Sequence, residues 1–328
     1  MSFQRVVIGV DFGDASLAAA RWTALQLAPD AEVVLTHVLP EPVAPPYLQP
    51  RLPPAVEFSA TLAPAFYGGL RGLAEMIGVR RTTIHMAAGD PADALARTAA
   101  ELDADLICVG RGKRRRGAAR FGATTAQRLL ARTDVPTAIV PSCVRAAPER
   151  ILAAVDAGAA GERVTDTACR LATRFEARVE ALHVIDDALQ DLVQVAHEVA
   201  LAAVGAHLDG QDTAERDRVA GSPADARLLR DLASGWVEAL LVRLAHAPSR
   251  AHPVIRFGDP GQQLLARTVE RGVDLVVMGR GGDEPHVPPH TGLRFVGSTT
   301  RLVAWAAPCP VLVVPTRSGR QRGGAEDA

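Results

Sequence analysis

The chain has 328 residues and a formal net charge of −1, with 48% apolar but only 4% aromatic residues. This length suits two domains of ordinary size, and the near balance of charge argues against bulk binding of nucleic acid and against a solvating acidic tail. The four cysteines form no CxxC pair or regular framework, so we expect reduced thiols in a cytoplasmic protein.

The first predicted element is a buried strand, VVIGV, within residues 5–13. Its apolar run is too short for the core of a signal peptide, and no uncharged run approaches the roughly 20 residues of a membrane helix. We therefore expect a soluble protein. A second buried strand, VVLTHV, lies within 33–40, and the Pro-rich stretch 39–58 predicts an extended surface loop.

A Gly-Asp-Pro motif predicts the start of the next helix. Asp90 suits the N-cap, Pro91 suits the first turn, and Leu95 falls on the inward face. Two further strands, ADLICV within 104–112 and PTAIVP within 135–142, follow this helix. Continuous runs rich in Val and Ile are typical of parallel strands that helices cover on both faces.

The same elements then recur in the same order in the second half of the chain. The paired stretches are RVVIGVDFG (5–13) and RILAAVDAG (150–158), VVLTHVLP (33–40) and VEALHVID (179–186), GDPADAL (89–95) and GDPGQQL (258–264), ADLICVGRG (104–112) and VDLVVMGRG (273–281), and VPTAIVPS (135–142) and CPVLVVPT (309–316). An ordered duplication of this kind indicates a repeated domain. We predict two tandem domains, 1–145 and 150–316.

Each predicted domain alternates strands with helices, which is the pattern of an α/β fold with a doubly wound parallel sheet. The second copy replaces the Pro-rich loop with a helical stretch near 187–208 and a polar linker near 209–224, and a further helix is predicted near 225–246. The Gly-rich, charged tail 317–328 is predicted to be disordered. Ligands on such sheets bind beyond the carboxyl ends of the strands.

Four duplicated motifs together resemble a tandem pair of universal stress protein domains. They are the Val-Asp that ends the first strand, the His-Val that ends the second, the Gly-Asp-Pro before a helix, and the Gly-rich loop before the last helix. The resemblance covers nearly all of both copies apart from the inserted segments and the tail. It implies two tandem doubly wound, Rossmann-like domains of the adenine-nucleotide alpha-hydrolase-like type. It also implies ATP, with or without magnesium, as the ligand of a G-x2-G-x9-G-[S/T] loop.

Carried over to the first copy, the resemblance implies a nucleotide site built from Asp11, Val38, Gly110, Gly112, Lys113, Ala123, Thr124 and Thr125. The loop spacing is kept, but Lys113 and Ala123 stand where the family has glycine. Lys113 could clash with a phosphate, or it could point outward and supply charge. Ala123 retains its backbone N–H, although its methyl group takes up room.

In the second copy the resemblance implies a site built from Asp156, Val184, Gly279, Gly282, Gly297, Ser298, Thr299 and Thr300. All the loop glycines are present, but the spacer has 14 residues instead of nine. The extra residues lie within DEPHVPPHTG, where prolines exclude a helix and predict a protruding flap. The helix that begins at Gly-Ser-Thr-Thr offers N–H groups and a dipole to a phosphate; an ordinary capped helix after a loop is the alternative.

Several other residues have a plausible structural role as well as a functional one. The dense basic run 113–116 with Arg120 could contact polyphosphate or could be a solvated loop. His286 and His290 have the spacing of metal ligands on a helix, but two prolines separate them, which argues against zinc. The histidines that end the second strand of each copy, and the cysteine of the fourth strand, are predicted to be structural; these are His37, His183 and Cys108.

Catalytic signatures are missing from the sequence. It contains no Gly-x-Ser-x-Gly elbow, no P-loop GK[S/T] and no Ser-Gly-Gly-x-Asp-Ser loop, so no enzyme activity is assigned, although slow ATP hydrolysis is left open. We expect a stress-response regulator whose interactions depend on bound adenine nucleotide. A nucleotide-independent interaction scaffold of the same fold is the alternative.

The last strand of each copy carries proline at its ends, as sheet-edge strands do. Because universal stress domains commonly pair through this strand, the resemblance implies an intramolecular pseudo-dimer. Further association of two chains into a homodimer is left open. Neither nucleic acid nor a membrane is an expected partner.

Overall fold

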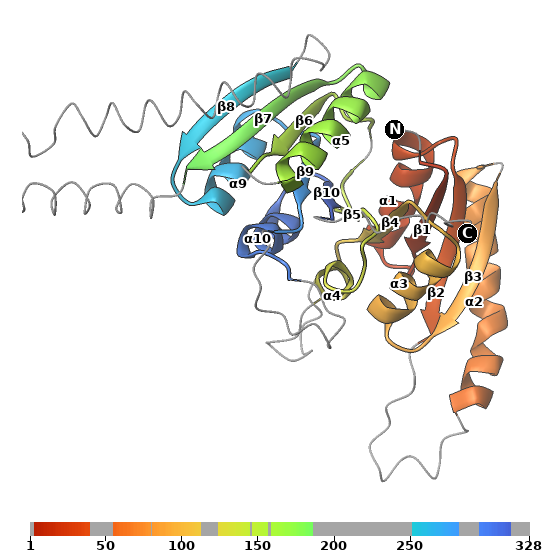
Figure 1. The fold of residues 1–328 in the computed structure, drawn as a ribbon. Helices are drawn as coiled ribbons and strands as arrows, with labels where there is room; N and C mark the ends of the chain where they lie inside the picture. The colour runs from red at the N-terminus through yellow and green to blue at the C-terminus, as the bar shows by residue number, and fades with distance from the viewer. Residues whose placement is uncertain are drawn as a thin grey trace, which may run out of the picture.

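The computed structural model describes residues 3–39, 55–79, 81–112, 124–144, 146–156, 159–185, 251–281 and 295–315. These ranges build a ten-stranded sheet with helices packed on both faces (Figure 1). Some expected features lie outside the described residues: the second-copy helices near 187–208 and 225–246, the linker near 209–224, and the tail 317–328.

The first half of the chain alternates strands and helices as the apolar runs predict. Its elements are β1 (Arg5–Gly9), α1 (Asp14–Trp22) continuing as the π-helical turn η1 (Thr23–Leu27), β2 (Glu32–Leu39), α2 (Ala55–Ile77), β3 (Thr82–Ala88), α3 (Pro91–Glu101), β4 (Leu106–Gly110), α4 (Thr125–Leu130) and β5 (Thr137–Val140).

One expected boundary is wrong. The Pro-rich loop was expected to reach residue 58, but α2 already begins at Ala55. The dense run of prolines ends at Pro54, and proline is tolerated just before or at the first turn of a helix.

The second half repeats this order. Its elements are β6 (Arg150–Ala154), α5 (Ala159–Phe175), β7 (Arg178–Ile185), β8 (Ala251–Phe257), α9 (Pro260–Glu270), β9 (Leu275–Gly279), α10 (Ser298–Ala306) and β10 (Val311–Val314).

Both Gly-Asp-Pro helices start as predicted. The carboxylate of Asp90 accepts hydrogen bonds from the backbone N–H groups of Ala92 and Asp93, and that of Asp259 accepts one from Gln262. Asp90 also forms an ion pair with Arg128 of α4. The first turn of α3 is therefore held to α4 as well as capped.

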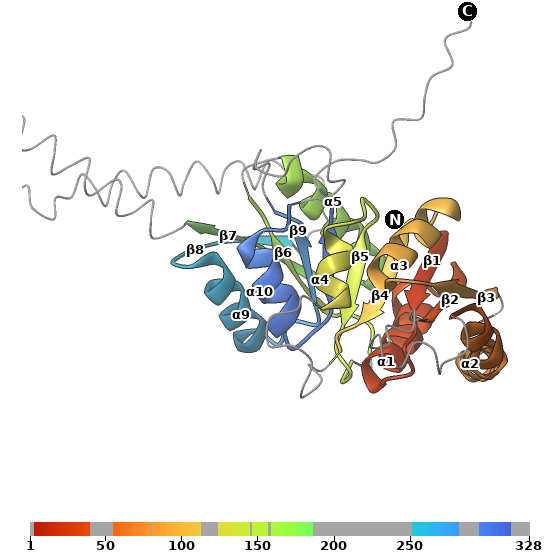
Figure 2. The same ribbon diagram turned by 90° about the horizontal axis from the view of Figure 1, so that it is seen from below.

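The strand order is β3-β2-β1-β4-β5-β10-β9-β6-β7-β8. Pairing is parallel within each half, whereas β5 and β10 pair antiparallel, with Ala138 opposite Leu312. Figures 1 and 2 show the two halves on either side of this central pair. Because the central pair is antiparallel, the carboxyl ends of the two parallel halves lie on opposite edges of the sheet. Any strand-end sites in the two halves therefore face away from each other.

Two apolar clusters cover the two faces of the sheet, and each cluster includes residues from both halves. One contains side chains of α1, η1, α2 and α5, among them Leu27, Leu70 and Leu171. The other contains side chains of α3, α4, α9 and α10, among them Leu95 and Val303. Among the described helices, none has both the length and the apolar character needed to span a membrane.

Candidate functional site

A cavity of about 330 Å³ lies at the carboxyl ends of β6, β7 and β9 in the second half. Most of the second-copy candidates line it, namely Asp156, Val184, Gly279, Gly297, Ser298, Thr299 and Thr300. Gly282 lies outside the described residues. The strand ends and the start of α10 thus bring together residues that are more than 100 positions apart in the sequence.

The residues that follow β9 lie in close contact with the residues that begin α10. The backbone N–H of Gly297 donates to the carbonyl of Arg280 over 3.0 Å, and the Thr300 hydroxyl donates to the carbonyl of Gly279 over 2.9 Å. Gly281 has φ of +133°, and a Cβ at this position would lie 2.5 Å from the Gly297 nitrogen. Only glycine fits there, so the backbone forms this wall of the cavity.

The N-terminus of α10 is open toward the cavity. Its N-cap is Gly297, so the N-cap residue has no side chain to accept a hydrogen bond from the first turn of this nine-residue helix. Ser298 and Thr299 line the same space and add hydroxyl groups. Unpaired N–H groups, a helix dipole and hydroxyl donors together suit an anion.

The loop arginine contributes no charge to this cavity. The Arg280 side chain is buried, and its guanidinium donates to the carbonyl of Thr133 over 2.7 Å and to the Asp134 carboxylate over 3.2 Å, both in the first half. Attraction of an anion therefore depends on backbone and hydroxyl groups.

Asp156 is the acidic residue of the cavity. Among the described residues no cluster of three metal-ligating side chains occurs. His286 and His290, the weak zinc candidates, lie outside the described residues.

The corresponding helix start in the first half has a different arrangement. Thr124 is the N-cap of α4, its hydroxyl accepts from the backbone of Gln127 over 3.3 Å, and the Gln127 side chain accepts from the Thr124 N–H over 3.0 Å. This capping box uses the groups that a phosphate would need. In α10 the position equivalent to Gln127 is Arg301, which has no acceptor and cannot complete the box.

The other first-copy candidates have structural contacts or open surroundings. The Asp11 carboxylate accepts from the N–H of Gly13 over 2.9 Å, and a Cβ on Gly110 would lie 2.4 Å from the backbone of α1. Val38 packs against the apolar cluster under α3, and Thr125 is the first residue of α4. Gly112 has nothing within 4 Å of a built Cβ. The basic run 113–116, Arg120 and Ala123 lie outside the described residues.

The histidines at the ends of the second strands are structural, as predicted. Nδ1 of His37 lies 2.7 Å from the carbonyl of Val10, and Nδ1 of His183 lies 2.8 Å from that of Val155. A carbonyl only accepts, so Nδ1 carries the proton in both rings. His37 also stacks on Phe66 with ring centroids 4.3 Å apart, which closes the strand ends of the first half under α2.

The buried position of Cys108 is confirmed. Burial raises the pKa of its thiol to about 12, although a hydrogen bond from Thr23 acts in the opposite direction. Burial likewise raises the pKa of the Cys309 thiol to about 12. Neither thiol suits nucleophilic chemistry at neutral pH.

Sequence reasoning missed two residues of the Gly-rich loop that line the second-half cavity, Gly281 and Phe295. The sequence did contain a signal for Gly281. It stands beside Gly282 in GRGG, and the family spacing gives a role only to Gly282. Sequence reasoning also missed the capping box of the first half, although Thr-x-x-Gln at 124–127 is the expected signature.

Comparisons with known proteins agree with this architecture. The profile of the Universal stress protein family matches residues 2–141 and 148–315. A universal stress protein from Archaeoglobus fulgidus DSM 4304 has a similar structure, with a TM-score of 0.60 and 15% identity over 95% of this chain and 98% of that one. A functionally unknown protein, PA1789 from Pseudomonas aeruginosa PAO1, has a TM-score of 0.57 and 13% identity over 95% of this chain and 92% of that one.

A comparison with curated proteins finds no match. At such low identities the similar structures establish the fold alone, whereas the family profile covers nearly the whole chain in two successive matches. The chain belongs to the universal stress protein family and carries two of its domains in tandem.

Proposed function

We propose that this protein binds an adenine nucleotide, ATP, in the cavity of its second domain, and that it acts as a cytoplasmic stress-response regulator through nucleotide-dependent interactions. The observation that carries the proposal is the open start of α10, where Gly297, Ser298 and Thr299 line the cavity and the N-cap glycine has no side chain to cap the helix. An anion with several oxygens is the ligand that such a helix start accommodates best.

The rest of the cavity suits a nucleoside. Val184, Leu264 and Met278 give it an apolar wall of the kind that holds a base, and Asp156 offers a carboxylate to a ribose hydroxyl. Its volume of about 330 Å³ is at the lower end of the range for small-molecule sites, which suits a single nucleotide. Magnesium, where present, would be held by the nucleotide's phosphates, and Asp156 is a carboxylate that lines the cavity and could contribute to its binding.

The proposal assigns one nucleotide to the chain. In the first domain the capping box of α4 uses the Thr124 hydroxyl and backbone groups that would otherwise face a phosphate. That observation also favours the second candidate function, an interaction scaffold that needs no nucleotide. No catalytic step is part of either proposal.

The antiparallel pairing of β5 with β10 supports a pseudo-dimer of the two domains within one chain. Light scattering of the purified protein would decide whether two chains associate further; a mass near 34.5 kDa means a monomer.

The test is direct. The purified chain is denatured and its released small molecules are analysed, and the emptied, refolded protein is titrated with ATP and with AMP by calorimetry. We expect a stoichiometry near one, with a loss of affinity when Ser298 and Thr299 are both changed to alanine and no loss in Thr125→Ala. Absence of binding at millimolar ATP would overturn the proposal and leave the scaffold function.

A further inference from the structure

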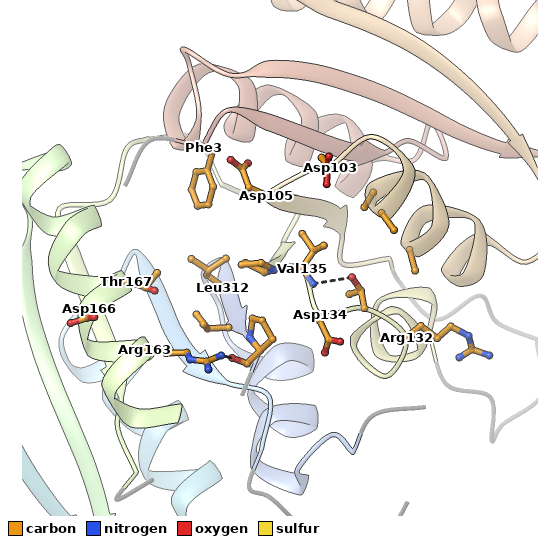
Figure 3. Close-up of a pocket in the computed structure, with 18 of the residues that line it drawn as sticks. Phe3, Asp103, Asp105, Arg132, Asp134, Val135, Arg163, Asp166, Thr167 and Leu312 are labelled. Atoms are coloured by element: carbon orange, nitrogen blue, oxygen red, sulfur yellow. Dashed lines mark hydrogen bonds between the residues drawn. The ribbon is translucent and has the colours of Figure 1, made fainter. Parts of the chain in front are cut away.

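A second and larger cavity lies between the two domains, away from the nucleotide cavity. It has a volume of about 690 Å³ and shares no lining residue with the cavity at α10 (Figure 3). Phe3, Val135 and Leu312 give it an apolar floor, and alanines of α3 add a smooth wall. This size and lining are those of a site for a small organic molecule.

At one position that lines the cavity, the two repeats differ greatly in side-chain size. The register of the first strands makes Trp22 of α1 equivalent to Thr167 of α5. The buried positions of the two helices agree with this register: Ser16, Ala19, Ala20, Trp22 and Thr23 in α1, and Gly161, Val164, Thr165, Thr167 and Ala168 in α5.

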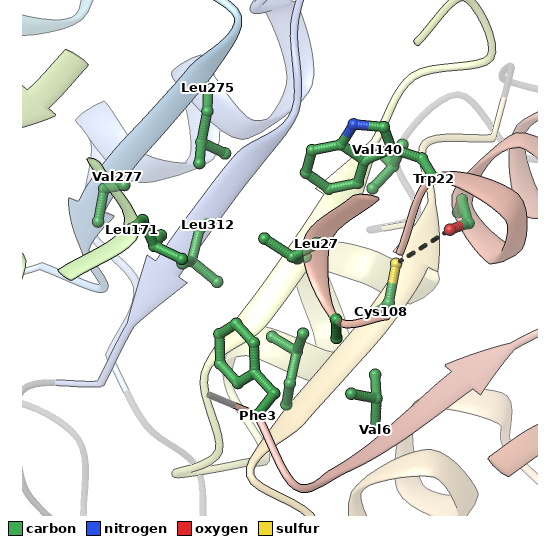
Figure 4. Close-up of a cluster of buried hydrophobic side chains, with 14 of the residues drawn as sticks. Phe3, Val6, Trp22, Leu27, Cys108, Val140, Leu171, Leu275, Val277 and Leu312 are labelled. Atoms are coloured by element: carbon green, nitrogen blue, oxygen red, sulfur yellow. Dashed lines mark hydrogen bonds between the residues drawn. The ribbon is translucent and has the colours of Figure 1, made fainter. Parts of the chain in front are cut away.

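In the first domain the indole of Trp22 is buried within the apolar cluster, with Val140 beside it (Figure 4). Its Nε1 donates to the carbonyl of Ala146 over 2.8 Å, in the segment that joins the domains. In the second domain Thr167 is far smaller than an indole and lines the 690 Å³ cavity. The replacement of a large aromatic residue by threonine therefore leaves space that the first domain fills.

One wall of this cavity carries a stripe of charge. Arg163, Asp166, Thr167 and Arg170 project from α5 at the spacing of one helix face, as the labelled members show in Figure 3. Arg163 donates one N–H to the carbonyl of Pro315 over 3.2 Å, and Arg170 has no hydrogen bond or ion pair to any residue that the structure describes. With a single aspartate between two arginines, the stripe has an excess of positive charge.

The opposite wall carries three aspartates, Asp103, Asp105 and Asp134, and each of them already has an interaction partner. The Asp105 carboxylate accepts from the backbone N–H groups of Gln4, over 2.7 Å, and of Arg5. The Asp134 carboxylate accepts from the buried guanidinium of Arg280. The charge that is available to a ligand is therefore the cationic stripe on α5, which favours an anion over a cation.

We propose that this interdomain cavity binds a small amphipathic acid. Its apolar body would lie against Phe3, Leu312 and the alanines of α3, and its carboxylate would face Arg163 and Arg170. The proposal is independent of nucleotide binding, because the two cavities share no residue.

Calorimetric titration of the full chain with decanoate tests it, with decyltrimethylammonium as a probe of equal length and opposite charge. We expect decanoate to bind one per chain and the cation to bind at least tenfold more weakly. Thr167→Trp places the residue of the first repeat into the cavity and should abolish binding. Thr173→Trp, at an exposed position of the same helix, is the matched control and should leave binding unchanged.

The double variant Arg163→Gln with Arg170→Gln should weaken decanoate binding about tenfold without altering the unfolding transition. This variant also tests the proposal if Thr167→Trp fails to fold. Arg71→Gln, an exposed arginine on α2, is its control. The proposal is overturned if decanoate does not bind, if the cation binds as tightly, or if a folded Thr167→Trp protein retains the affinity of the parent.

Discussion

Arg111 and Arg280 occupy the same position in the two Gly-rich loops, and each guanidinium donates to a backbone carbonyl of the other domain. Arg280 reaches the carbonyl of Thr133, and Arg111 reaches that of Ala307. Each acceptor lies four residues before the last strand of its domain, so the two contacts are equivalent. Each loop is thereby held against the opposite domain, and displacing a loop would disturb the interface between them.

The first prediction concerns the contact that Arg280 makes with the opposite domain. Arg280→Ala removes a donor from the Asp134 carboxylate and from the Thr133 carbonyl in a largely buried position, and we expect it to lower the free energy of unfolding by about 3 kcal/mol. Urea denaturation followed by circular dichroism measures this. Arg71→Ala, which removes an exposed i,i+4 ion pair, should cost less than about 0.5 kcal/mol. Equal effects of the two changes would mean that Arg280 does not stabilise the interface.

The second prediction concerns the backbone wall of the nucleotide cavity. Gly281→Ala places a Cβ 2.5 Å from the Gly297 nitrogen at a φ of +133° that other residues avoid. The loop must shift, so ATP affinity should fall at least tenfold in a calorimetric titration. Gly72→Ala, on exposed α2 with nothing within 4 Å of the new methyl group, should leave the affinity unchanged. An unaltered affinity in Gly281→Ala would remove this loop from the proposed site.

The fold could be predicted from the sequence because its signals are local and are written twice. Val- and Ile-rich runs give the buried parallel strands, and Asp-Pro gives the starts of α3 and α9, where Asp90 and Asp259 cap the helices. The strand-end residues Asp156 and Val184 could be placed together because the carboxyl ends of parallel strands meet at one edge of a sheet.

Other features depend on geometry that a pattern does not carry. The positive φ of Gly281 is set by the return of the loop to Gly297, across a segment whose length differs between the copies. The direction of the Arg280 side chain depends on the neighbouring domain. The interdomain cavity depends on the placement of α3, α5 and Phe3 around one space, which only tertiary packing brings about.

The third prediction tests whether Thr124 serves as a helix cap or as a nucleotide-binding residue. Thr124→Ala removes the acceptor for the Gln127 N–H and should lower the free energy of unfolding by about 1 kcal/mol, whereas Thr124→Ser should retain most of it. Neither change should alter the stoichiometry or affinity of ATP binding measured in the same preparations. Loss of a bound nucleotide in Thr124→Ala at unchanged stability would instead assign this threonine to a site in the first domain.

The last prediction concerns the cysteines. Burial raises the pKa of the Cys108 and Cys309 thiols to about 12, whereas Cys143 is exposed, so iodoacetamide at pH 8 should modify Cys143 and spare the two buried thiols. Peptide mass spectrometry identifies the modified residue. Since a raised folded-state pKa favours the protonated thiol, this contribution to stability is complete below about pH 9 and is lost as the pH rises toward 12. The midpoint of urea denaturation should therefore fall over that pH range, and it should fall less in Cys108→Ala. In the labelling experiment, rapid modification of Cys108 at pH 8 in the folded protein would contradict its burial against α1.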